Sequence, residues 1–232
     1  MKSYSEVEWI DGRFRQDFIG TLFLNLGKYY GDYIKTTKDV PFWYSERTYV
    51  GHLAQSACRS KYYSIQDYDV AGQDVKKGKK SHYAPDLRIW MPKDRGNPDT
   101  CVFEVKTTVA IPISKDLDEY SNIVKGQLDV ANQQIVDHGW YEGNYRCALV
   151  ATPVYCAATK WGKYAKTPRI YHENVKNLRT NVVNSLRSTG ANFAWTYFMK
   201  YEMVNELASK LKVNLPWIGI ICIGKVMVYK SE

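Results

Sequence analysis

The sequence predicts a single α/β domain in which helices cover both faces of a central β-sheet. Apolar residues recur at helical spacing in several segments, as Phe18, Leu22 and Leu26 do near the start of the chain. Between such segments stand near-continuous apolar runs, which are typical of strands that are covered on both faces; the clearest are residues 146–155 and 217–228. A length of 232 residues with 45% hydrophobic and 24% charged residues fits one large globular domain.

The expected elements alternate along the whole chain, with no linker that would separate two domains. Helical periodicity predicts helices at residues 13–34, 42–60, 114–136, 178–186 and 203–211. Apolar and β-branched runs predict strands at residues 63–70, 84–90, 100–107, 146–155, 193–199 and 217–228.

The most informative of these elements are the two strands within residues 84–107, which we expect to form a hairpin. Their connector, residues 92–99, is dense in proline, glycine, asparagine and aspartate. Because successive side chains of a strand alternate between faces, Glu104 and Lys106 should project from the same face. Pairing of the two strands would bring Asp86 beside Glu104, so that two carboxylates and one ammonium group converge.

This combination of charges has a chemical use. Two neighbouring carboxylates repel each other unless a cation lies between them, and hard oxygen ligands suit Mg²⁺. A metal ion held by Asp86 and Glu104 would polarise a phosphoryl oxygen and lower the pKa of a bound water. Lys106 would orient or deprotonate that water, or stabilise developing negative charge.

The arrangement resembles the signature of the PD-(D/E)xK nuclease superfamily. Pro85-Asp86 matches the first half of the signature, and Glu104-Val105-Lys106 matches the second half. The resemblance implies a restriction-endonuclease-like fold, with a mixed central β-sheet flanked by helices, whose core spans about residues 40–155. An N-terminal helix and a C-terminal α/β extension would complete a nuclease-like domain over residues 1–232. The resemblance also implies that Asp86 and Glu104 bind Mg²⁺, for which Mn²⁺ would substitute, and that Lys106 is the catalytic lysine.

Two further residues enter the expected site through the same resemblance. Members often add a glutamate from a helix ahead of the hairpin, and Glu46 fits that place as a third metal ligand. Since Ser45 is a suitable helix cap, Glu46 could instead only stabilise the first turn of that helix. Many members also carry a glutamine on the helix after the second strand, often followed four residues later by tyrosine. Gln127 fits the glutamine, but Ala131 replaces the tyrosine, and a half-buried structural glutamine is the alternative.

The charge of the chain suggests a polyanionic partner. The formal net charge is +8, and a basic surface attracts nucleic acid through its phosphates. One lysine cluster comes just before the Asp86 strand, and a second basic cluster is interleaved with Trp161 and Tyr164; either could also be a solvated loop. The first cluster, which we expect to contact DNA, consists of Lys76, Lys77, Lys79 and Lys80, and the second of Lys160, Lys163, Lys166 and Arg169.

Several other classes of protein are disfavoured. No apolar run reaches the ~18 residues of a membrane span, and residues 1–8 have no signal-peptide core, so we expect a cytoplasmic protein without membrane contact. The five cysteines are scattered without a CxxC pair and are expected to be buried, reduced thiols. Neither GxxxxGK[ST] nor GxGxxG is present, so nucleotide-driven chemistry has no support.

The sequence therefore predicts a metal-dependent DNA endonuclease that hydrolyses phosphodiester bonds. Restriction, phage defence, mobile-element cutting and repair all remain open as its setting. One alternative is a catalytically silent subunit of the same fold that binds nucleic acid or serves assembly. Another is a nuclease that acts on RNA or on single strands. Whether the chain acts alone, as a homodimer or with a partner subunit also stays open.

Overall fold

The computed structural model describes most of the chain. It covers residues 4–41, 45–66, 70–74, 79–83, 85–113, 117–137, 144–157, 160, 163–211 and 217–229. For residues 4, 70–74, 79–83, 117–118, 137 and 208–211 the backbone alone is described. Among these residues, no helix is long and apolar enough to cross a bilayer.

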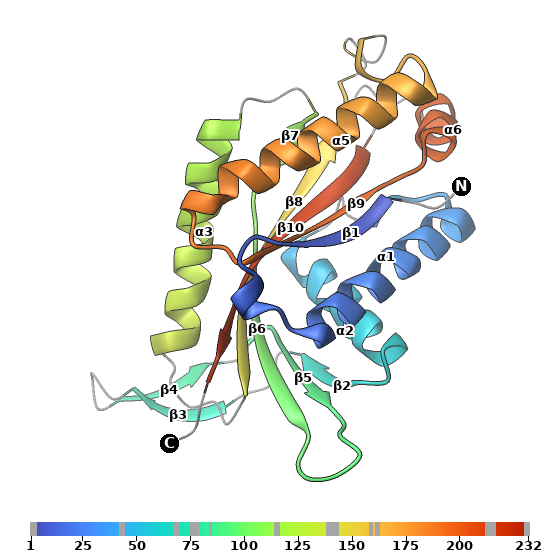
Figure 1. The fold of residues 1–232 in the computed structure, drawn as a ribbon. Helices are drawn as coiled ribbons and strands as arrows, with labels where there is room; N and C mark the ends of the chain where they lie inside the picture. Colours follow the sequence, from blue (N-terminus) through green and yellow to red (C-terminus); the bar gives the residue numbers. More distant parts are fainter. Residues whose placement is uncertain are drawn as a thin grey trace.

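An eight-stranded mixed β-sheet forms the centre of the described structure (Figure 1). Its strands follow the order β1-β9-β10-β8-β6-β5-β2, and β7 pairs with β8 outside this path. The β6–β8 and β7–β8 pairs are parallel, whereas the other pairs of the sheet are antiparallel. The strands are β1 (Tyr4–Trp9), β2 (Tyr63–Gln66), β5 (Leu87–Met91), β6 (Asp99–Thr107), β7 (Ile111–Pro112), β8 (Tyr145–Tyr155), β9 (Phe193–Phe198) and β10 (Trp217–Val228). A separate two-stranded sheet pairs β3 (Val70–Asp74) with β4 (Lys79–Tyr83).

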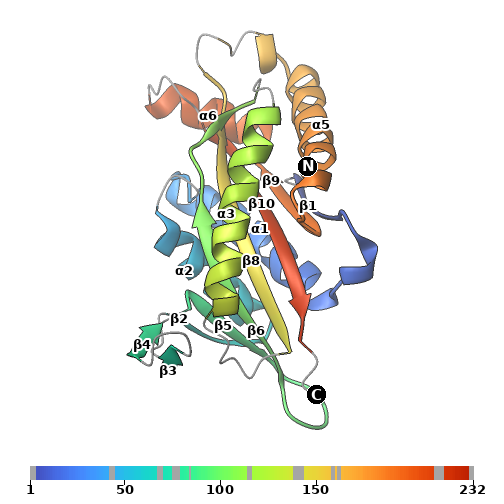
Figure 2. The ribbon, with the colours of Figure 1, turned by 90° about the vertical axis from the view of Figure 1, so that its left-hand side faces the viewer.

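Helices lie on both faces of the central sheet (Figures 1 and 2). On one face, the ring of Phe23 in α1 packs against Phe193 and Trp195 of β9. On the other face, Tyr120 of α3 donates to Thr152 of β8 at 2.9 Å. The helices are α1 (Asp17–Thr37), α2 (Glu46–Arg59), α3 (Leu117–Asp137), α5 (Pro168–Ser185) and α6 (Tyr201–Leu211), with short 3-10 turns at η1 (Gly12–Phe14) and η2 (Leu186–Ser188).

The core lies between the sheet and these helix layers. All six side chains of β9 are buried, as are nine of the eleven side chains of β8. A strand can be apolar on both faces only where both faces are covered, which explains the continuous apolar runs of these strands. Burial of this kind contributes ~25 cal/mol per Å² of apolar surface and dominates the stability of the fold.

The α/β class and most expected elements are confirmed; α5 begins at Pro168 and not at residue 178, and the other main differences lie in the N-terminal half. The strand expected at residues 63–70 ends at Gln66, and residues 70–83 carry the β3–β4 pair, which the sequence analysis did not anticipate. Strand β1 was also not expected, because its alternating polar residues give it little apolar signal. The thiols are free and four are buried, but Cys58 is exposed on α2, contrary to the expectation for this residue.

Candidate active site

The β5–β6 hairpin positions the candidate site as the sequence analysis expected. Gly96 makes the connector turn with a φ of +87°, a conformation that residues with a side chain rarely adopt. The register pairs Met91 with Asp99 and ends at the pair of Leu87 with Phe103. Beyond Phe103, strand β6 continues to residue 107, so its last residues extend past the end of β5.

Asp86 occupies the position where β5 leaves β6. Its Oδ2 accepts a hydrogen bond from the backbone N–H of Val105 at 2.6 Å. This carboxylate thus takes the place of a ladder acceptor that a longer β5 would have supplied. Pro85, which precedes it, has no N–H to donate to a ladder. Pro85 is therefore the sequence signal for where the pairing of β5 with β6 ends. The sequence analysis missed this signal, and with it the hydrogen bond of the Val105 amide.

Lys106 lies at the centre of the site, between two carboxylates. Its Nζ is 2.8 Å from Oε1 of Glu104 and 3.7 Å from Oε1 of Glu46. The Glu104 side chain is 4% exposed, that of Lys106 17% and that of Glu46 36%, so the cluster opens to solvent on the Glu46 side. The structure therefore brings together Asp86, Glu104, Lys106 and Glu46 on three separate segments of the chain.

The residues of the site come from both faces of the sheet and meet beside the part of β6 that has no β5 neighbour. Lys106 is registered with Val150 of β8, which shares a face with Thr152 and therefore with α3. Glu46 instead begins α2, which packs with α1 on the other face. The contact between Lys106 and Glu46 therefore lies beside the part of β6 that extends beyond the end of β5.

The electrostatics of the site reflect its partial burial. Burial raises the pKa of Asp86 to about 6, although the Val105 N–H bond opposes this; the charge of Glu104 adds to the rise. Burial alone would lower the pKa of Lys106, but its hydrogen bond and charge interaction with Glu104 outweigh that effect and raise it. Titratable groups shifted by both burial and specific charge partners gather at functional sites more often than elsewhere.

The start of α2 bears out the expected place of Glu46. Ser45 is the N-cap, with φ −74° and ψ 170°, and Glu46 lies in the first turn. No side-chain capping bond is made by Ser45. Glu46 therefore has the helix-start position that favours a carboxylate and also lies within reach of Lys106. The two interpretations of this residue are compatible with each other.

The remaining expected site residues are not joined to this cluster. Gln127 is half-buried on α3, and within the part of the chain that the structure describes no hydrogen bond or ion pair connects it to the four clustered residues. Of the lysines expected to contact DNA, Lys76 and Lys77 lie outside the described residues. Lys79 and Lys80 lie on β4, and their side chains are outside the description.

The donor set suits a small hard cation, although the side chains do not yet surround one. Among the described residues, no group of three or more His, Cys, Asp or Glu side chains has the spacing to hold a metal ion. In this structure the Lys106 ammonium pairs with Glu104, and Asp86 accepts a hydrogen bond from the Val105 amide. Mg²⁺ usually takes only one or two protein carboxylates and completes its shell with waters and phosphate, so Asp86 and Glu104 fit such an ion.

No protein-family model, no curated protein and no solved structure matches this chain. The proposal for its function must therefore rest on the residues and geometry of the site.

Proposed function

We propose that the chain is a Mg²⁺-dependent nuclease that hydrolyses phosphodiester bonds in DNA. The observation that carries this proposal is the convergence of Asp86, Glu104 and Glu46 around Lys106 at the open edge of β6. It corresponds residue by residue to the motif that resembles the PD-(D/E)xK superfamily. The net charge of +8 favours a polyanionic substrate.

Each residue has a role that follows from its position. Asp86 and Glu104 would hold the ion, whose chemistry is to polarise a phosphoryl oxygen and make water a better nucleophile. Lys106 would orient the attacking water and receive or return its proton, or stabilise charge on the phosphate. Glu46, whose side chain is 36% exposed, would keep Lys106 positioned from the solvent side.

A purely structural ion pair explains this cluster less well. Lys106 needs one carboxylate for neutralisation, and Glu104 already supplies it at 2.8 Å. A buried Asp86 whose pKa is raised to about 6 costs stability at neutral pH, and its hydrogen bond from Val105, which an uncharged asparagine would also accept, gives no reason to keep a carboxylate there. A bound divalent cation would give such a reason.

One observation favours a second candidate, the silent nucleic-acid-binding subunit. Lys106 is engaged directly by Glu104, as in a structural ion pair, and the carboxylates do not already surround a cation position within the described part of the chain. In that case the protein would bind nucleic acid and never cut it.

Incubation with supercoiled plasmid, linear duplex, single-stranded DNA and RNA distinguishes these candidates. Each substrate is tested with Mg²⁺, Mn²⁺ or chelator, for the parent protein and for Asp86→Asn, Glu104→Gln and Lys106→Met. The matched control is Glu173→Gln, which removes a carboxylate from an exposed i,i+4 pair with Arg169 on α5. We expect metal-dependent cutting of DNA by the parent and by the control, and loss of cutting in the three site variants.

The other outcomes are equally informative. Cutting of RNA alone would reject DNA as the substrate while keeping the reaction. Cutting that persists in chelator, or in Asp86→Asn and Glu104→Gln, would reject the metal site. Binding without cutting under every condition would support the silent subunit.

A further inference from the structure

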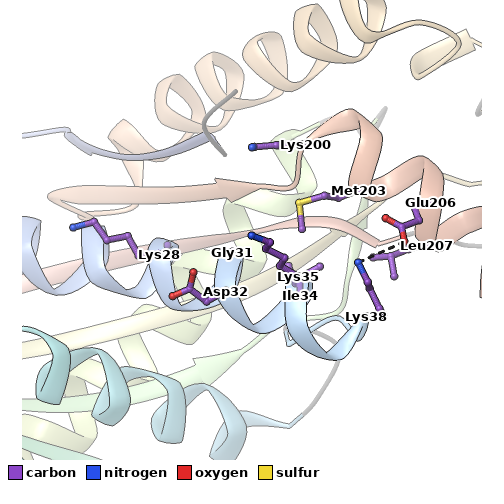
Figure 3. A pocket seen from close by; sticks show the side chains of 11 residues that line it. Lys28, Gly31, Asp32, Ile34, Lys35, Lys38, Lys200, Met203, Glu206 and Leu207 are labelled. Carbon is purple, nitrogen blue, oxygen red and sulfur yellow. Dashed lines mark ion pairs between the residues drawn. The ribbon is translucent and has the colours of Figure 1, made fainter.

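A second site lies away from the carboxylate cluster, in a cavity of about 570 Å³ between α1 and α6 (Figure 3). Four lysines line it: Lys28 and Lys35 from α1, Lys38 from the C-cap of α1, and Lys200 from the segment that leads into α6. The sequence analysis missed this group, because about 160 residues of chain separate Lys200 from the others.

The apolar part of the lining explains why the cavity exists. Ile34 of α1 faces Met203 and Leu207 of α6. Gly31 has no side chain to fill the space between these helices, and an added Cβ there would meet only the Tyr197 hydroxyl, at 3.8 Å. A cavity with an apolar floor and a cationic rim is the result.

Two carboxylates of the lining, Asp32 and Glu206, neutralise only part of the charge of its four lysines. Asp32 forms an ion pair with Arg59 at 2.8 Å, and Glu206 with Lys38 at 3.5 Å. Within the described residues, no ion pair engages Lys28, Lys35 or Lys200; Lys28 makes only a 3.4 Å hydrogen bond to Asn25.

The remaining ammonium groups are arranged along the cavity. Lys28 and Lys35 are seven residues apart, so they lie on one face of α1 about 10 Å from each other along its axis. Figure 3 shows Lys35 and Lys200 extending to the same side of the cavity from α1 and from the start of α6. Ammonium groups that outnumber the carboxylates around them are stabilised by an anionic ligand.

From this geometry we propose that the cavity between α1 and α6 binds the phosphodiester backbone of one nucleic-acid strand. Lysine suits phosphate as a point charge, and the separation of Lys28 and Lys35 along α1 lets them contact different phosphates of one strand. The apolar floor would contact sugar or base. This inference rests on the proposed function in one respect: the nuclease proposal is the reason for choosing nucleic acid among the ligands that carry phosphate.

The test compares two double variants with equal loss of charge. Lys28→Gln/Lys35→Gln removes two cations of the cavity, whereas Lys125→Gln/Lys176→Gln removes two exposed lysines of α3 and α5 on the opposite face of the sheet. Fluorescence anisotropy of a labelled single-stranded oligonucleotide is recorded in chelator, so that nothing is cut, across a series of salt concentrations. Each phosphate that a protein neutralises on a single strand contributes ~0.7 to the slope of log K against log salt. We therefore expect this slope to fall in magnitude by about 1.4 for the cavity variant and to stay unchanged for the control.

Three results would overturn the inference: equal slopes for both double variants, no oligonucleotide binding by the parent, or displacement of the oligonucleotide by polyglutamate as readily as by unlabelled strand. Tighter binding of tripolyphosphate than of the oligonucleotide would assign the cavity to a small polyphosphate instead. The cutting assays are separate. A parent protein that binds through the cavity and cuts nothing would keep this inference and reject the nuclease.

Discussion

Lys106 has both a structural role, as the ion-pair partner of a buried carboxylate, and a proposed catalytic role. Substitutions can separate the two roles. Lys106→Met removes the partner of Glu104, whose side chain is 4% exposed, so we expect a loss of about 3 kcal/mol in the free energy of unfolding. Adding Glu104→Gln to the same chain removes the buried charge and should recover most of that loss. Denaturant unfolding of the single and double variants measures both effects.

Recovery of stability should not restore the reaction. Removing a positioned acid–base group typically lowers the rate by about 10²–10⁴, so single-turnover cutting by Lys106→Met should fall by that amount under conditions where circular dichroism shows a folded protein. A folded Lys106→Met variant that cuts at the parent's rate would remove Lys106 from the mechanism.

Asp86 likewise does two things, because one of its oxygens completes the hydrogen bonding of β6. Asp86→Asn keeps an acceptor for the Val105 N–H, whereas Asp86→Ala leaves that amide without the bond of 2.6 Å. We expect Asp86→Ala to be less stable than Asp86→Asn by about 1–3 kcal/mol, since a buried donor would be left unsatisfied. Calorimetric titration with Mn²⁺ should show weakened binding in both variants. Equal stabilities would mean that water replaces the carboxylate at this edge.

At the scale of elements, the packing of α2 on α1 makes the stability of the protein depend on pH. His52 of α2 is 8% exposed and is surrounded by the rings of Tyr29, Tyr30 and Tyr33 of α1, with centroid distances of 5.3, 5.3 and 6.3 Å. Burial lowers its pKa from 6.5 to about 4. The unfolded chain therefore binds this proton more readily than the folded protein does.

Above about pH 6.5 His52 is neutral in both the folded and the unfolded chain and does not lower the free energy of unfolding. As the pH falls toward 4, the unfolded chain takes up the proton first, and the free energy of unfolding falls by up to about 3 kcal/mol. His52→Leu cannot titrate and should lose this part of the pH dependence. Unfolding free energies of parent and variant measured from pH 4 to 8 should diverge in slope below pH 6.5; parallel curves would contradict the assignment.

Sequence reasoning succeeded for elements with a strong period or clear turn residues. The β5–β6 hairpin, the shared face of Glu104 and Lys106, and Glu46 at a helix start were all expected from local sequence, and the structure has them. Strand β1 was missed because its exposed face is acidic: Glu6 and Glu8 bind Arg179 of α5, a partner about 170 residues away. The lysines of the cavity between α1 and α6 were missed for the same reason, since tertiary packing alone brings them together.

At the scale of the whole molecule, a metal ion that binds the folded chain should stabilise it. A ligand at 100 times its dissociation constant adds about 2.7 kcal/mol when the unfolded chain does not bind it. For a domain of this size each kcal/mol raises Tm by about 2–4 °C. Thermal unfolding with saturating Mn²⁺ should therefore show a Tm about 5–10 °C above that in chelator.

The same measurement separates this site from metal bound elsewhere on the surface. Asp86→Asn and Glu104→Gln should lose the metal-dependent rise in Tm, whereas Glu173→Gln on α5 should keep it. Because the readout is stability, it holds even if the right substrate has not been found. A rise in Tm that survives in both site variants would place the bound ion away from β6, and the cluster around Lys106 would then be an ion-pair network that holds the edge of the sheet.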